Sequence, residues 1–320
     1  MNEIFDVAII GGGPAGLSAG IYSSRAKLKT VILNSGSFGG QVVLTDEVAN
    51  YPGVEQTKGF NLAAVMKKQA KDFGCKLIGN IEITEYHLND EIKKIVLSDG
   101  REIKARGVIF ATGGRPRLLG VEGENEFRGR GISFCATCDG DFFTGKEVVV
   151  VGGGNSALEE AISLTKFATK VTIVHQFDHF QAFPAVIDEA KKTPKLNFIM
   201  ESRIVKFLRS EKLEAVEIEH ITSGTRHIFK TDGVFIFIGY IPNTEDLKGI
   251  LPLNDRGEII VDSDMFTGIP GVYAAGDSIA KKYRQITTAV AEGTIASLSL
   301  AEYIKSKVKI FEDEKNLVVG

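Results

Sequence analysis

The chain has 320 residues, 43% apolar and 25% charged, so its composition is that of a globular protein with enough length for two domains. Its 38 Lys and Arg against 41 Asp and Glu leave a formal charge of −3, which argues against a nucleic-acid partner. No apolar run approaches the roughly 20 residues that cross a bilayer, and the start, MNEIFDVAII, lacks the features of a signal peptide. We therefore expect a cytoplasmic protein with no membrane partner.

The first predicted unit is a strand, a tight turn and a helix at 6–20, DVAIIGGGPAGLSAG. Gly11, Gly13 and Gly16 have the spacing of a dinucleotide-binding turn, in which backbone approaches a pyrophosphate and helix packs closely on strand. The next strand ends in Asn34, where a carboxylate usually binds the ribose, although an amide can also bond a hydroxyl. We predict a dinucleotide site here, the alternative being a glycine turn without a ligand.

Residues 81–104 and 204–230 alternate apolar and polar side chains around turn signals, which predicts two small antiparallel sheets. Strands followed by glycine are predicted at 107–114, 233–244 and 271–277. Each would end where the carboxyl edge of a parallel sheet meets a ligand.

A second strand, turn and helix at 147–161, EVVVVGGGNSALEEA, repeats the first. Three small residues occupy the positions of the first glycines: Gly152, Gly154 and Ala157. The strand that follows leads into HQFDHFQ at 175–181, with neither a carboxylate at its end for an NAD ribose nor an arginine for the NADP phosphate. This copy is either a structural remnant or a weak nicotinamide nucleotide site.

The predicted fold class is α/β, with two Rossmann-like (three-layer ββα) dinucleotide-binding domains, the second inserted into the first. Pro116 and Pro242 disfavour regular structure where the chain would cross between them. We place the first domain at 1–115 and 243–320 and the inserted domain at 116–242.

Cys135-Ala136-Thr137-Cys138-Asp139 is the chemical centre of the sequence. A Cys-x-x-Cys pair can form a reversible disulfide and tends to lower the pKa of its thiols. Asp139 could move the proton that exchange requires, although a turn or cap is the common role for such an Asp. Because the third cysteine, Cys75, is distant and no second Cys-x-x-Cys exists, we predict no metal site. Cys75 itself is predicted to be a buried packing residue.

Together these motifs resemble a low-molecular-weight thioredoxin reductase from about residue 4 to about residue 305. They are, in order, GGGPAG (11–16), GGQ (39–41), ATGG (111–114), CATCDG (135–140), GGGNSALEEA (152–161), AAGD (274–277) and YRQ (283–285).

The resemblance implies a flavoprotein oxidoreductase with FAD at the first glycine turn. The positions that match flavin contacts are Gly11, Gly13, Gly16, Gly39, Gln41, Asn50 and Asp277, with Arg284 and Gln285 beside the isoalloxazine. Asn34, together with Ala111 and Gly113 of the ATGG motif, completes the predicted cofactor site.

By the same resemblance, Cys138 faces the flavin and forms the charge-transfer thiolate, Cys135 attacks the disulfide of thioredoxin, and Asp139 is the general acid-base. The resemblance also implies a homodimer.

The family's NADPH signature, His-Arg-Arg with a further Arg, is replaced here by His175, Gln176, Phe177 and Gln181. Each charge-assisted contact to a phosphate contributes roughly 1.5 to 3 kcal/mol, so their loss disfavours NADPH as the electron donor. The pattern is similar to the ferredoxin-dependent flavin thioredoxin reductases, which implies ferredoxin as donor. The alternatives are the same enzyme using NADH or NADPH, and a redox-sensing flavoprotein.

Ferredoxins are usually acidic, and the cations at 281–284, KKYR, adjoin the predicted flavin contacts. They are a candidate dock, although such runs are more often ordinary solvated surface. The last ten residues, FEDEKNLVVG, are expected to fray.

Overall fold

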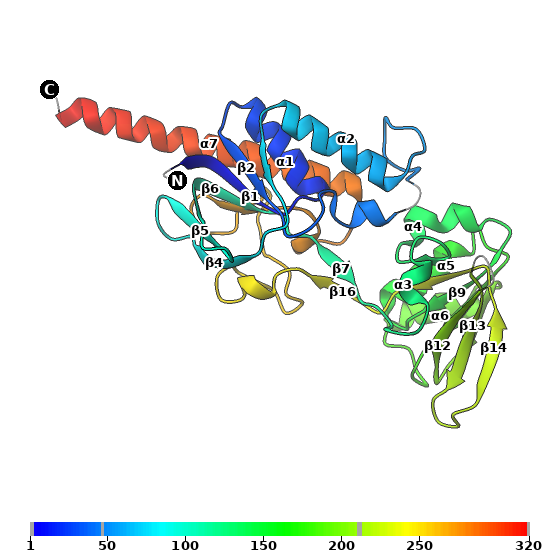
Figure 1. Cartoon of the computed structure of the whole chain (residues 1–320). Coiled ribbons are helices and arrows are strands. Elements are labelled where there is room, and N and C mark those ends of the chain that lie inside the picture. Colours follow the sequence, from blue (N-terminus) through cyan, green and yellow to red (C-terminus); the bar gives the residue numbers. More distant parts are fainter. Residues whose placement is uncertain (1–2, 46–47, 210–212, 319–320) are drawn as a thin grey trace. The chain divides into compact units, whose positions relative to one another are not determined.

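The computed structural model describes residues 3–45, 48–209 and 213–318, and Figure 1 shows the course of the chain. The chain divides into two compact units. The first unit contains residues 1–47, 51–115 and 241–320, and the second contains residues 48–50 and 116–240.

The first unit is built on a seven-stranded sheet of order β3-β2-β1-β6-β5-β4, with β17 paired to β6. Its strands are β1 (Ile4–Ile10), β2 (Thr30–Leu33), β3 (Lys76–Ile78), β4 (Ile83–His87), β5 (Lys93–Leu97), β6 (Glu102–Phe110) and β17 (Val272–Ala274). β1, β2, β3, β6 and β17 run parallel, whereas β4, β5 and β6 form an antiparallel ladder. The antiparallel sheet predicted at 81–104 is confirmed, and β6 joins it to the parallel strands.

Helices α1, α2 and α7 lie side by side in the first unit (Figure 1). The helical segments are α1 (Pro14–Arg25), α2 (Gly59–Asp72), α7 (Ile286–Val318) and the 3₁₀ turns η1 (Gly40–Leu44), η3 (Glu245–Leu247) and η4 (Gly276–Ser278). The expectation that the tail frays is wrong as far as Val318, because α7 continues to that residue. The segment is rich in Glu and Lys, which are good helix formers.

The second unit contains an all-parallel sheet of order β11-β10-β9-β15-β8 and an antiparallel sheet of order β12-β13-β14. Its parallel strands are β8 (Ile132–Ser133), β9 (Glu147–Val151), β10 (Lys170–Val174), β11 (Leu196–Ile199) and β15 (Gly233–Ile236). The antiparallel strands are β12 (Ser202–Arg209), β13 (Leu213–His220) and β14 (Arg226–Lys230). The second predicted antiparallel sheet is thus confirmed.

The helical segments of the second unit are α3 (Glu124–Phe127), α4 (Ala136–Asp139), η2 (Gly140–Phe143), α5 (Asn155–Leu164) and α6 (Pro184–Lys192). Two short strands, β7 (Gly114–Pro116) and β16 (Tyr240–Pro242), pair with each other where the chain passes between the units.

Burial explains why the central strands form. Val148 to Val151 of β9 and Val7 to Ile10 of β1 are nearly inaccessible on both faces, as expected for strands inside a parallel sheet. The predicted α/β fold with parallel sheets is confirmed. Because carboxyl ends of parallel strands meet at one edge, the loops after β1, β6 and β17 converge in the first unit, and those after β8, β9 and β10 converge in the second. None of the helices that the structure describes is long and apolar enough to cross a membrane.

Candidate functional site

The first glycine turn is packed tightly at two of its three key positions. A Cβ on Gly11 would lie 2.1 Å from Ala111 O, and one on Gly16 would lie 1.9 Å from Gly11 O. At Gly13 the nearest atom to a Cβ would be Gly40 Cα at 3.8 Å. The backbone at Gly13 is therefore open, at the start of α1, where a helix N-terminus favours phosphate.

The side chain of Asn34 stabilises this turn through hydrogen bonds to the backbone. Its Oδ1 accepts a hydrogen bond from Gly12 N at 2.8 Å, and its Nδ2 donates to Gly36 O at 2.7 Å and Ser37 O at 3.1 Å. Both amide hydrogens are thus donated to loop carbonyls, and only acceptor capacity on Oδ1 remains for a ribose hydroxyl. Contact between Asn34 and a cofactor stays a prediction.

The GGQ segment joins the same loop cluster. Gly39 N donates to Gly12 O at 2.7 Å, and both Gly39 and Gly40 adopt the positive φ that favours glycine. Gln41 is exposed, within η1. Asn50 is also exposed and belongs to the second unit, and its contact with a cofactor stays a prediction.

The ATGG segment after β6 forms the opposite side of the turn. Ala111 N donates to Ile10 O at 2.7 Å, and a Cβ on Gly113 would meet no atom of the described residues within 4 Å. Thr112 Oγ1 is buried and, among the residues described, has no hydrogen-bond partner. A buried hydroxyl without a partner, beside an open glycine backbone, fits a polar ligand bound in the first turn.

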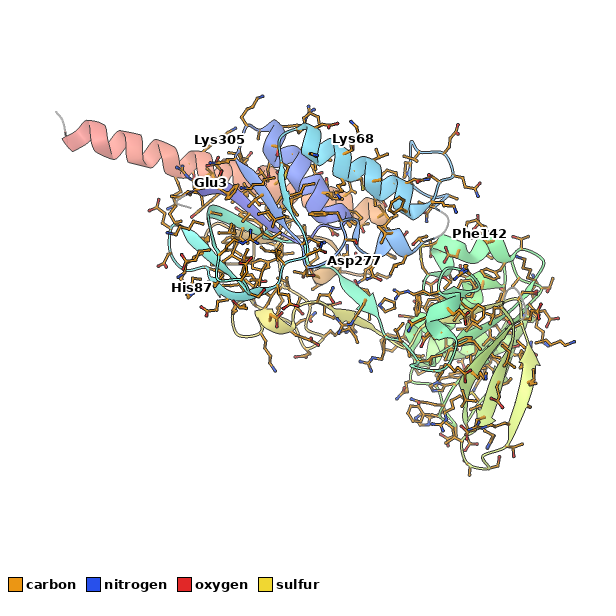
Figure 2. The ribbon with its side chains drawn as sticks, in the orientation of Figure 1. Glu3, Lys68, His87, Phe142, Asp277 and Lys305 are labelled. Atoms are coloured by element: carbon orange, nitrogen blue, oxygen red, sulfur yellow. A yellow bond between two sulfur atoms is a disulfide. The ribbon has the colours of Figure 1, made fainter. Side chains whose placement is uncertain are left out.

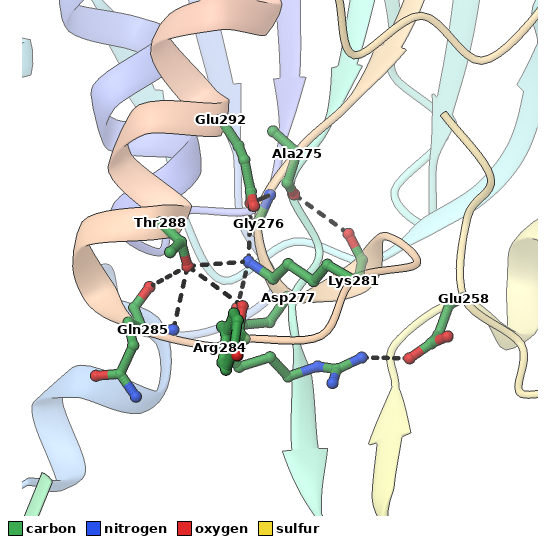
Figure 3. Close-up of polar contacts among 11 residues, drawn as sticks. Glu258, Ala275, Gly276, Asp277, Lys281, Arg284, Gln285, Thr288 and Glu292 are labelled. Carbon is green, nitrogen blue, oxygen red and sulfur yellow. Dashed lines mark hydrogen bonds and ion pairs between the residues drawn. The ribbon is translucent and has the colours of Figure 1, made fainter. Parts of the chain in front are cut away.

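Asp277 lies in η4, directly after β17, and is labelled in Figure 2. Lys281 Nζ lies 2.9 Å from Asp277 Oδ1 and 2.8 Å from Glu292 Oε2, as Figure 3 shows. Glu292 Oε2 also accepts a hydrogen bond from Gly276 N at 3.0 Å. The pKa of Glu292 is raised, because the effect of burial outweighs the lowering effect of its hydrogen bond with Lys281. Asp277 is therefore oriented by a largely buried ion-pair network.

The two other predicted contacts lie just before α7. Arg284 is paired with Glu258, and Gln285 N donates to Thr288 Oγ1 at 3.2 Å (Figure 3). The interpretation of 281–284 as a basic dock is weakened, because Lys281 and Arg284 are both neutralised by carboxylates. Lys282 is exposed and lies over the ring of Tyr283.

In the second unit, Cys135 and Cys138 form a disulfide with a Cα–Cα distance of 5.3 Å. Cys135 is the N-cap of α4, and Cys138 N donates to Cys135 Sγ at 3.2 Å. Both residues are half-buried. The remaining cysteine, Cys75, is buried as predicted, and burial raises the pKa of its thiol to about 12, so it is not a nucleophile at neutral pH.

Asp139, the last residue of α4, is half-buried and hydrogen-bonded to Ser133 Oγ at 2.6 Å. Ser133 also accepts a hydrogen bond from Cys135 N at 3.1 Å. Sequence reasoning missed Ser133, because a serine two residues before a cysteine has many ordinary turn roles.

The second glycine turn keeps the geometry of the first. A Cβ on Gly152 would lie 2.4 Å from Phe237 O, whereas for one on Gly154 the nearest atom among the described residues would be Gln181 O at 4.0 Å. Gln181 N donates to Gly153 O at 2.8 Å, and Phe183 N donates to Asn155 Oδ1 at 2.7 Å. The segment after β10 therefore lies against the turn and the start of α5.

That segment has an aromatic lining. His175 is buried against Gly153, with its ring stacked on Phe180 and edge-on to Phe177. Burial lowers the pKa of His175, so its imidazole is neutral at pH 7 and supplies no positive charge. Asp178, the carboxylate nearest the strand end, is exposed and paired with His179 at 2.6 Å.

The family model for pyridine nucleotide-disulphide oxidoreductases matches residues 5–293. A thioredoxin reductase of Peptoclostridium acidaminophilum is 44% identical over 313 residues, covering 96% of this chain and 99% of its own length. One from Listeria innocua is 40% identical over 315 residues, covering 98% of each chain. The crystal structure of a Streptococcus pyogenes thioredoxin reductase superposes with a TM-score of 0.92 at 38% identity, covering 96% of this chain and all of that one.

Proposed function

From the chain's membership of the pyridine nucleotide-disulphide oxidoreductases and, within them, of the thioredoxin reductases, we propose that it reduces thioredoxin with electrons from ferredoxin. The thioredoxin reductases are FAD-binding flavoenzymes. The exchange would proceed through Cys135 and Cys138, with Asp139 moving the proton. The observation that carries the donor assignment is the aromatic segment at 175–180, which has no Arg or Lys and a neutral His175 where a 2′-phosphate would require cations.

The residues around the first glycine turn fit FAD, because the open backbone at Gly13 and the buried hydroxyl of Thr112 both suit a pyrophosphate. When bound, FAD would accept electrons from the donor and pass a pair to the disulfide. We assign it to the domain formed by 1–115 and 243–320, with Asp277 orienting its polar chain and Arg284 and Gln285 near its ring. Residues 116–242 would form the degenerate nucleotide domain that carries the cysteine pair.

The exchange step balances within the chain's own residues. Asp139 takes the proton of the Cys135 thiol, and the resulting thiolate attacks one sulfur of the thioredoxin disulfide. A bond forms from Cys135 Sγ to that sulfur, and the other sulfur leaves as a thiolate that takes the proton from Asp139. The Cys138 thiol then gives its proton to Asp139, and its thiolate attacks Cys135 Sγ and breaks the bond between Cys135 and thioredoxin. The released thioredoxin sulfur takes that proton from Asp139, so the enzyme regains its disulfide and thioredoxin leaves as a dithiol.

The direction of electron flow is favourable. The reduction potential of a ferredoxin, about −400 mV, is more negative than that of thioredoxin, about −270 mV. Electron transfer from ferredoxin to thioredoxin is therefore thermodynamically favourable. Among the described residues, Lys282 is the cation of the 281–284 run without a carboxylate partner, so electrostatic docking of ferredoxin at this run alone would be weak.

Anaerobic titration of the purified flavoprotein tests the donor assignment. We expect reduced ferredoxin to bleach the flavin and support thioredoxin reduction, and stoichiometric NADPH and NADH to leave the flavin oxidised. Rapid bleaching by either nucleotide would instead establish the alternative donor, which the intact turn at Gly152 and Gly154 favours. Bleaching by ferredoxin without thioredoxin reduction would identify a redox-sensing flavoprotein. Sedimentation of the same sample tests the homodimer implied by the resemblance.

A further inference from the structure

Ser133 has no part in the roles assigned so far, yet its hydroxyl lies between two functional groups of the exchange site. Its Oγ lies 2.6 Å from Asp139 Oδ2 and 3.1 Å from Cys135 N, and the residue is 5% exposed. We infer that Ser133 is a positioning residue, which fixes the Asp139 carboxylate beside the Cys135 backbone and stabilises its ionised form. This inference rests on the proposed role of Asp139 in thiol–disulfide exchange.

The direction of the hydrogen bonds follows from the proton count. A serine hydroxyl has one proton, and its oxygen already accepts the N–H of Cys135. The two acceptors in reach are Asp139 Oδ2 at 2.6 Å and Cys135 O at 3.3 Å. The shorter bond, to the charged group, is the stronger one, so Ser133 donates to Asp139.

The backbone of Ser133 is held independently of the cysteine loop. It is the last residue of β8 and pairs with Phe235 of β15 in the parallel sheet. Through its hydroxyl, the rigid edge of the sheet is connected to both ends of the redox segment, Cys135 and Asp139. A carboxylate held in this way keeps one orientation while it takes a proton from one sulfur and returns it to another.

The test isolates the exchange half-reaction. FAD-loaded enzyme is reduced anaerobically with dithionite and mixed with oxidised thioredoxin from pH 5.5 to 8.5, and acid-quenched samples are alkylated to count thioredoxin thiols. Ser133→Ala should slow the exchange about ten-fold near neutral pH. In the plot of exchange rate against pH, the midpoint of the fall toward acid pH should move up by about one pH unit. Ser133→Thr, which keeps the hydroxyl, should recover the rate to within about three-fold and restore the midpoint.

The matched control is Ser202→Ala, a buried serine of the same unit whose Oγ donates to Met200 O at 2.8 Å. Ser202→Ala should have the exchange rate and pH profile of the wild type. Ser133→Gly, which adds no methyl group beside the carboxylate, must behave as Ser133→Ala does if the lost hydroxyl is the cause. A wild-type rate and pH profile in both Ser133→Ala and Ser133→Gly would overturn the inference. A slower rate with an unmoved midpoint and a lowered melting temperature would also overturn it, since that result indicates a structural role.

Asp139→Asn separates this inference from the function on which it rests. If Asp139→Asn slows the exchange while Ser133→Ala and Ser133→Gly do not, only the positioning role of Ser133 is wrong. If Asp139→Asn is also unimpaired, the proposed role of Asp139 is wrong and the inference falls with it.

Discussion

Lys281 Nζ lies 2.8 Å from Glu292 Oε2, the same carboxylate oxygen that accepts the N–H of Gly276. Their side chains are 10% and 15% exposed, so the pair is largely removed from water. One ammonium thereby connects α7 to the η4 turn that contains Asp277. The orientation of a predicted cofactor residue thus depends on a residue outside the cofactor motif.

Lys281→Met should leave Glu292 and Asp277 without their shared cation. Breaking a largely buried ion pair by removing one partner costs about 3 kcal/mol, so we expect a lower free energy of unfolding and loss of FAD on gel filtration. Lys282→Met, at an exposed position, is the matched control and should retain the wild-type free energy of unfolding and the bound FAD. Full FAD retention by Lys281→Met would show that Asp277 does not need this network.

Alanine substitutions at two glycines separate packing from ligand binding. Gly16→Ala would place its Cβ 1.9 Å from Gly11 O, so we expect misfolding or a loss of about 3 kcal/mol or more in stability. Gly13 has a φ of −79°, and a Cβ there would meet no atom of the described residues closer than 3.8 Å. Gly13→Ala should therefore fold normally yet bind FAD at least about ten-fold more weakly, because the methyl group would occupy ligand space.

Differential scanning calorimetry of the FAD-free proteins and flavin fluorescence titration measure the two effects. Gly36→Ala is the control, because a Cβ there would meet nothing within 4 Å in the part of the chain that the structure describes. Equal FAD affinity in Gly13→Ala and the wild type would contradict a pyrophosphate site at this turn.

The sequence predicted the fold class and both antiparallel sheets because hydrophobic periodicity and glycine spacing are local signals. It could not predict the ion pairs of Lys281 with Glu292 and of Arg284 with Glu258, since these partners lie 11 and 26 residues away along the chain. These ion pairs weaken the interpretation of the 281–284 run as a dock, which stays a prediction. Likewise, the role of Asn34 as a brace for Gly12 depends on a turn geometry that residue identity alone does not specify.

Restoring cations beside the second glycine turn should create a response to NADPH. Gln176, Phe177 and Gln181 are all exposed, so Arg side chains at these positions can reach a bound phosphate without entering the core. Each charge-assisted contact contributes roughly 1.5 to 3 kcal/mol, so the triple variant should bind NADPH at least about a hundred-fold more tightly. The rate of flavin bleaching by NADPH measures this, and a triple variant with unchanged affinity would show that the aromatic segment was not the barrier.

His175 predicts a pH dependence of stability. Burial lowers its pKa in the folded protein, so the unfolded chain binds a proton near pH 6.5 while the folded chain does not. The contribution of His175 to the free energy of unfolding is therefore fully present above about pH 6.5. It is lost as the pH falls below that value, with a slope of up to about 1.4 kcal/mol per pH unit. His175→Phe should reduce the loss of stability between pH 7.5 and 5.5 in urea unfolding.

His227→Phe, at an exposed position of β14, provides the comparison and should keep the wild-type pH dependence. If His175→Phe loses as much stability as the wild type over this range, His175 is not the group responsible.

Trapping the exchange intermediate tests most directly the central claim, that Cys135 attacks the thioredoxin disulfide and Cys138 resolves the product. Reduced Cys138→Ser enzyme is mixed with oxidised thioredoxin and examined by intact mass spectrometry without reductant. We predict a one-to-one mixed disulfide through Cys135 that dithiothreitol releases, and no such adduct with Cys135→Ser. An adduct formed by Cys135→Ser but not by Cys138→Ser would reverse the two roles, and the absence of an adduct from both would contradict the account.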